Sequence, residues 1–91
     1  MSDAIKITVG DGICHVQMTR PEKKNALTAA MYQSMADALA DAENNPAVRV
    51  ILISGSGGSF TAGNDLADFL ATPPLDDSAP VFRFIKGFAQ L

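Results

Sequence analysis

Cysteine is almost absent from this sequence of 91 residues, which contains only Cys14. A single cysteine excludes an internal disulfide and any zinc site that is built from several cysteine ligands. No apolar run approaches the ~20 residues that a membrane-spanning helix needs. The first residues show neither the basic segment nor the apolar segment of a secretory signal peptide. These absences lead us to expect a soluble, cytoplasmic protein that does not act in a membrane.

Positive charge is also scarce, with 7 lysines and arginines against 10 aspartates and glutamates. A formal net charge of -3 argues against nucleic acid or an anionic membrane as the main partner. Hydrophobic residues make up 47% of the chain and charged residues 19%, which is a globular composition. The composition therefore indicates a folded domain and not a disordered chain.

Two short runs near the start alternate apolar and polar residues, which is the period of a half-buried strand. Ile5, Ile7 and Val9 mark the first run, and residues 13–19 form the second. Because a Gly-Asp-Gly turn at 10–12 separates them, a β-hairpin is predicted.

A helix and a further strand are predicted next. Thr28 is a suitable N-cap, and the Asn-Asn-Pro sequence at 44–46 is a stop signal. One helical face carries a row of apolar residues, namely Met31, Met35, Ala38, Leu39 and Ala42. The nearly unbroken apolar run at 48–53 predicts a strand of a parallel sheet that is buried on both faces. The order strand, helix, strand predicts a βαβ unit and an α/β fold class.

The last third of the chain predicts a glycine-rich loop followed by helices. Residues 54–59 form the loop, residues 65–70 a short helix, and residues 72–79 a mobile loop. A longer helix should begin at Pro80, with Val81, Phe84, Ile85 and Phe88 on one face. We expect that face to have no partner within this chain. The pattern runs on to Leu91 without a terminal cap, so the polypeptide is expected to continue.

Known glycine-rich motifs test the loop at 54–59. A dinucleotide fingerprint would need a third glycine where Phe60 stands, and a Walker loop would need a lysine, but none lies between Lys24 and Lys86. Both fail, which disfavours a nucleotide-binding βαβ domain. The backbone N–H groups of such a loop can still bind an oxyanion. Alternatively, the loop only connects a strand to a helix, and its glycines only satisfy the geometry of the turn.

Two segments resemble motifs of the enoyl-CoA hydratase/isomerase (crotonase) family. Phe60-Thr61-Ala62-Gly63-Asn64-Asp65-Leu66 resembles the F-[ST]-A-G-x-D-L/I segment of that family. Arg20-Pro21 followed by Asn25-Ala26-Leu27 resembles its R-P-x-x-x-N-A-L loop. Both occur in order, with a helix and a buried strand between them. The resemblance covers essentially the whole chain, and implies that residues 1–91 are the N-terminal segment of one crotonase-like domain with a ββα spiral fold.

The resemblance implies an enzyme that binds acyl-CoA thioesters and stabilises an enolate in an oxyanion hole, as an enoyl-CoA isomerase or hydratase of fatty-acid-type metabolism. The backbone N–H of Asn64 would be one oxyanion donor. The family pattern puts the other donor and the acid/base carboxylates beyond Leu91, so the 91-residue piece alone should be inactive. The wording of residues 63–66 resembles the isomerase branch more closely. A non-catalytic acyl-CoA-binding or assembly protein of the same fold is the alternative.

The resemblance also implies substrate contacts and partners. Lys23 and Lys24 are candidates for the CoA phosphates, although a solvated turn is the favoured interpretation for either one alone. Asp65 is expected to cap the short helix and thereby order the loop. Coenzyme A would be part of the substrate, with no separate cofactor and no metal, and the full-length protein would be a homotrimer or a dimer of trimers. The residues expected at the substrate are Lys24, Ala26, Leu27, Ala62, Gly63, Asn64, Asp65 and Leu66.

Overall fold

The computed structural model describes residues 4–71 and 78–89. A hairpin of β1 (Ile5–Gly10) and β2 (Ile13–Met18) is followed by the 3-10 turn η1 (Pro21–Lys23) and by α1 (Ala29–Glu43). The strand β3 (Val50–Gly55), the short α2 (Leu66–Ala71) and α3 (Pro80–Ala89) complete the described part. The predicted mixed α/β architecture is confirmed. Most of the predicted loop at 72–79 lies outside the described residues.

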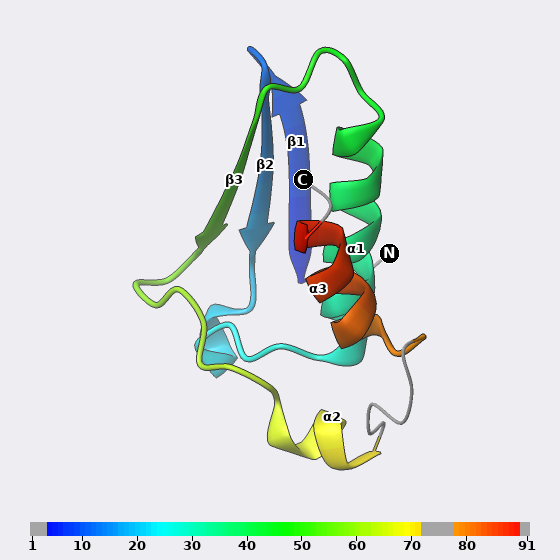
Figure 1. The fold of residues 1–91 in the computed structure, drawn as a ribbon. Coiled ribbons are helices and arrows are strands. Elements are labelled where there is room, and N and C mark those ends of the chain that lie inside the picture. Colours follow the sequence, from blue (N-terminus) through cyan, green and yellow to red (C-terminus); the bar gives the residue numbers. More distant parts are fainter. Residues whose placement is uncertain (1–3, 72–77, 90–91) are drawn as a thin grey trace.

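The three strands form one sheet in the order β1-β2-β3. β1 and β2 are antiparallel, with Ile7 opposite Val16. β2 and β3 are parallel, with Val16 opposite Ile53. Because α1 connects two parallel strands, the predicted βαβ unit is confirmed. The loops that follow β2 and β3 therefore leave the sheet at the same end (Figure 1).

The core lies between α1 and one face of the sheet (Figure 1). The Thr28 hydroxyl accepts a hydrogen bond from the Met31 N–H at 3.2 Å, as expected of the predicted N-cap. All of the apolar face predicted for α1 is buried, and it meets side chains of alternate positions in the hairpin. The buried residues of the sheet are Ile5, Cys14, Val16 and Met18.

The expectation that residues 48–53 are buried on both faces is wrong for the described chain. Val50 is 55% exposed and Leu52 49% exposed, whereas Ile51 and Ile53 pack against the core. Alternate residues of a strand point to opposite faces, and α1 covers only one of them (Figure 1). The apolar run therefore identified the strand correctly, but it did not indicate that one face of the strand is exposed.

The expectation that the helix from Pro80 lacks a partner is also wrong. α3 lies along α1 (Figure 1), and its Phe84 packs against the core. The rings of Tyr32 on α1 and Phe84 on α3 have centroids 5.7 Å apart. Arg83 Nη1 donates to the side-chain Oε1 of Gln33 at 2.9 Å. The Phe88 side chain lies outside the described residues. In the described part of the chain, no helix is long and apolar enough to cross a membrane.

Candidate functional site

Two loops far apart in the sequence meet at the carboxyl ends of β2 and β3. The first follows β2 and leads into α1, and the second follows β3 and leads into α2. They run side by side where Leu27 forms a parallel β-bridge with Asn64. The carboxyl ends of parallel strands are where open α/β sheets bind their ligands. This end of the molecule is therefore the candidate site.

Asn25 joins the loops through its side-chain amide, which is fully buried. Its Oδ1 accepts from the Arg20 N–H at 2.8 Å. Its Nδ2 donates to the carbonyl oxygens of Ser56 at 2.9 Å and Ser59 at 2.8 Å. A Cβ atom on Gly55 would lie 2.8 Å from this Nδ2, so only glycine lets the β3 loop approach so closely. The backbone φ of Asn25 is +58°, a left-handed conformation that asparagine tolerates better than most residues.

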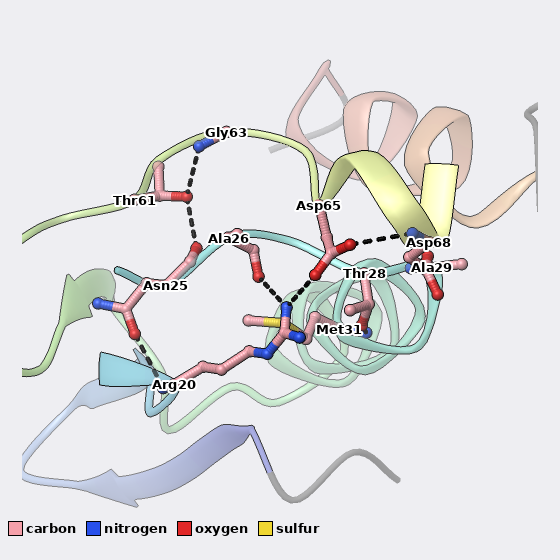
Figure 2. A network of polar contacts seen from close by, with 10 residues as sticks. All are labelled: Arg20, Asn25, Ala26, Thr28, Ala29, Met31, Thr61, Gly63, Asp65 and Asp68. Carbon is pink, nitrogen blue, oxygen red and sulfur yellow. Dashed lines mark hydrogen bonds and ion pairs between the residues drawn. The ribbon is translucent and has the colours of Figure 1, made fainter. Parts of the chain in front are cut away.

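Arg20 and Asp65 connect the loops a second time (Figure 2). Arg20 Nη1 lies 2.8 Å from Asp65 Oδ2 and 3.0 Å from the carbonyl oxygen of Ala26. Asp65 Oδ1 accepts from the Asp68 N–H at 2.9 Å, which confirms the predicted cap of α2. The Asp68 N–H, and next the Arg20 guanidinium, hold the pKa of the Asp65 carboxyl below its usual value. Asp68 in turn accepts from the Ala29 N–H at 2.7 Å, so α2 caps the start of α1.

The Thr61 hydroxyl is a third link between the loops (Figure 2). It donates to the carbonyl oxygen of Asn25 at 2.6 Å and accepts from the Gly63 N–H at 3.1 Å. The second bond closes a tight turn in which Gly63 has a φ of +88°. That conformation strains any residue with a Cβ atom, so glycine is required there. Serine and threonine are the side chains that can supply both bonds from one short hydroxyl.

The turn at Gly63 fixes the direction of the Asn64 N–H. The Leu27 N–H donates to the Gly63 carbonyl oxygen at 2.7 Å, and the Asp65 N–H donates to the Leu27 carbonyl oxygen at 2.8 Å. The Gly63 C=O and the Asn64 N–H belong to one planar trans peptide group, so they point in opposite directions. The Asn64 N–H therefore points away from Leu27. Within residues 4–71 and 78–89, no backbone or side-chain oxygen accepts it.

An apolar hollow of about 340 Å³ opens beside these loops. Its walls come from β2, β3, both loops, α1 and α3, and include Leu27, Tyr32, Phe60, Thr61, Val81 and Phe84. Hollows of this size and character can hold small apolar groups. The loops that carry the Asn64 N–H thus border an apolar hollow through Leu27 and Thr61.

Residues 8–91 match the enoyl-CoA hydratase/isomerase family. The chain belongs to the enoyl-CoA hydratase/isomerase family. The fold agrees, because OdaA from Pseudomonas aeruginosa superposes with a TM-score of 0.88 at 45% identity over 94% of this chain and 35% of that one. The crotonase-like ββα arrangement expected from the motifs is confirmed.

Relatives in the enoyl-CoA hydratase/isomerase family differ in their reactions. The hydroxycinnamoyl-CoA hydratase-lyase of Pseudomonas fluorescens is 38% identical over 65 residues, which is 71% of this chain and 24% of that protein. The human enoyl-CoA delta isomerase 2 is 33% identical over 72 residues, which is 79% of this chain and 18% of that protein. The chain thus spans about a quarter or less of the length of these relatives.

The structure brings together part of the set of residues that the family motifs single out. Leu27 contacts Gly63 and Asp65 directly, and the Arg20 guanidinium joins the Ala26 carbonyl to Asp65. Three other members of that set, Lys24, Ala62 and Leu66, are exposed at the edges of the loops. Among the described residues, their side chains take no part in the network of Figure 2.

Several residues of the site were not recognised from the sequence. The two family motifs include Arg20, Asn25 and Thr61, but no property of the sequence assigned a role to these residues. The position of Asp68, three residues after the capping residue Asp65, could have indicated a role at the start of α2. Its role as a cap of α1 could not have been found from the sequence. Nothing in the sequence pointed to Tyr32, whose hydroxyl donates to Asn64 Oδ1.

Proposed function

We propose that the full-length protein is an enoyl-CoA isomerase or hydratase, in which the Asn64 N–H is one donor of an oxyanion hole. The observation that carries this proposal is the direction of that N–H, which points away from Leu27 and meets no acceptor among the described residues. Family membership supports an acyl-CoA thioester as the substrate.

The chemistry needs such a donor. Removing a proton from the carbon next to a thioester carbonyl leaves negative charge on the carbonyl oxygen. An N–H that already points at this oxygen stabilises the transition state without any reorganisation of the loop, and one such donor contributes about 3–4 kcal/mol. The bonds from Leu27 and Thr61 keep the Gly63–Asn64 peptide in place before the substrate arrives.

The same hypothesis assigns the remaining parts of the site. A Cβ atom on Gly63 would meet no described atom within 4 Å, so the thioester has room to approach the backbone there. The apolar hollow beside Leu27 and Phe84 would receive the acyl chain. Coenzyme A enters as part of the substrate, and the proposed reaction uses no other cofactor. The full-length protein is proposed to assemble as a trimer or a dimer of trimers.

Isomerase and hydratase reactions differ in how the carboxylates are used. An isomerase returns the proton at C4 with one carboxylate, whereas a hydratase adds water across the 2,3 double bond with two. The Gly63-Asn64-Asp65-Leu66 wording and the human delta isomerase relative favour the isomerase. Assays of the full-length protein with 3-enoyl-CoA and 2-enoyl-CoA separate the two.

Two substitutions of Asn64 test the donor. Asn64→Pro removes the N–H, and kcat should fall on the order of 100-fold or more. Asn64→Ala keeps the N–H, and its loss should stay within about 10-fold. Circular dichroism and thermal melting must match the parent protein before the rates are compared, because proline also restricts Gly63.

Each outcome distinguishes between hypotheses. Equal losses for alanine and proline in folded variants would mean that the asparagine side chain, not its N–H, acts on the substrate. An unmodified protein that binds enoyl-CoA without converting it would instead support the non-catalytic acyl-CoA-binding alternative.

A further inference from the structure

The Asn64 side chain extends from the loop toward α1, where the Tyr32 hydroxyl donates to its Oδ1. The backbone on either side of Asn64 is already bonded to Leu27. The Gly63–Asn64–Asp65 segment is thus restrained by its backbone from one direction and by a side chain from another.

Tyr32 is itself well fixed. It lies near the start of α1, a helix of 15 residues whose apolar face is buried against the sheet. Its ring packs on that of Phe84 at a centroid distance of 5.7 Å and an interplanar angle of 52°. Burial raises the pKa of the Tyr32 phenol, so the hydroxyl stays protonated and available as a donor at neutral pH.

We infer that Tyr32 is a positioning residue, which acts through the Asn64 side chain to hold the Asn64 N–H toward the substrate oxygen. The inference rests on the proposed function, in which that N–H is the oxyanion donor. Tyr32 does not touch the reacting atoms. Its ring borders the apolar hollow, so the same residue links the hollow to the direction of the donor.

The geometry explains why a second restraint matters. The bonds to Leu27 and Thr61 set the direction of the peptide, but Gly63, which has no Cβ atom, still permits small torsional movements of the segment about that direction. A bond from the Asn64 side chain to a rigid helix reduces this freedom. An N–H that moves less stays aligned with the substrate oxygen, so it stabilises the developing charge more strongly.

The test uses the full-length protein and the variant Tyr32→Phe, which removes the hydroxyl and keeps the ring against Phe84. We expect kcat to fall about 3- to 10-fold with KM unchanged, as the loss of one hydrogen bond implies. Asn64→Ala removes the other end of the same bond and should give a similar loss. The double variant should lose no more than either single one, because both changes break one interaction.

A second measurement reports on the donor directly. In protein labelled with ¹⁵N-asparagine, the backbone amide signal of Asn64 should shift and its hydrogen exchange should accelerate in Tyr32→Phe. Gln33→Ala is the matched control, because Gln33 contacts α3 through Arg83, as Tyr32 does through Phe84, but bonds to Arg83 and Asp37 and not to the loop. That variant should leave both kcat and the Asn64 signal unchanged.

The outcomes separate this inference from the proposed function. An active parent protein with an unchanged Asn64 signal and kcat in Tyr32→Phe would overturn the role of Tyr32 and leave the function intact. Additive losses in the double variant would also overturn it, since Tyr32 would then act independently of Asn64. If the parent protein converts no enoyl-CoA, the proposed function fails, and the amide signal alone decides whether Tyr32 positions Asn64.

Discussion

Arg20 and Asp65 form an ion pair with Nη1 and Oδ2 2.8 Å apart, although they lie on loops that come after different strands. Their side chains are only 21% and 16% exposed. The same Arg20 nitrogen donates to the Ala26 carbonyl oxygen, and the same carboxylate caps α2. One pair thus fixes the spacing of the loops that carry Leu27 and Asn64.

Breaking this pair should disturb the site more than a surface ion pair would. In full-length Arg20→Gln, kcat/KM should fall on the order of 10- to 100-fold, because the Asn64 peptide moves relative to the substrate. Asp65→Asn should lose a similar amount, and the double variant should lose less than the product of the two. Steady-state kinetics of the four proteins measure this, and losses that simply multiply would show that the residues act separately.

The lowered pKa of Asp65 predicts how stability depends on pH. A carboxylate whose pKa is lower in the folded protein stabilises the fold fully above its unfolded pKa of about 3.8. That contribution declines as the pH falls from there through the folded pKa. The difference in unfolding free energy between the parent and Asp65→Asn should therefore be constant near neutral pH and shrink below about pH 4. Urea unfolding over a pH series checks this, and a difference that grew on acidification would contradict it.

Because the Thr61 hydroxyl makes two hydrogen bonds, its removal should lower the free energy of unfolding substantially. Thr61→Val keeps the shape but leaves the Asn25 carbonyl and the Gly63 N–H without partners, which should cost about 1–3 kcal/mol. Thr61→Ser keeps the hydroxyl and should cost clearly less. Urea unfolding compares the two variants, and equal costs would mean that the methyl group matters and the hydroxyl does not.

Asn25 should tolerate substitution least of the residues in the network. Asn25→Asp puts a carboxylate oxygen against the carbonyl oxygens of Ser56 and Ser59, so the variant should lose about 3 kcal/mol or more, or fail to fold. Asn45→Asp is the matched control, since Asn45 Oδ1 accepts from the Ala47 N–H and aspartate keeps that acceptor, and its effect should stay within about 0.5 kcal/mol. Soluble yield and thermal melting report the difference. Comparable stability of the two variants would contradict a central role for Asn25.

The open face of the sheet leads to a prediction about residues 1–91 alone. Val50, Leu52 and Ile13 are large apolar residues that remain exposed there, at 55%, 49% and 39%. Such a face, next to the free edge of β3, favours association. Sedimentation of the purified 1–91 polypeptide should therefore show self-association, and enoyl-CoA assays should show no turnover. A protected, inactive monomer would contradict the first expectation, and turnover that survives repurification would contradict the second.

The sequence by itself determined the elements whose signals are local. Alternation of apolar residues identified the hairpin, and the Thr28 cap with the helical apolar face identified α1. The run at 48–53 identified β3, and the start of α3 at Pro80 was correct. Each of these signals lies within one short segment, as a helical or strand periodicity or as a cap. No knowledge of distant parts of the chain was therefore needed.

The tertiary structure decided everything that depends on contacts between distant segments. Burial of β3 on one face, and the packing of α3 on α1, depend on which elements meet, and periodicity does not record this. The roles of Arg20, Asn25 and Thr61 appear only when their loops lie side by side, because each bonds to atoms beyond its own loop. The bond from Tyr32 to Asn64 joins residues of a helix and a loop, so it exists only in the folded chain, where a hydroxyl and an amide 32 positions apart come within reach.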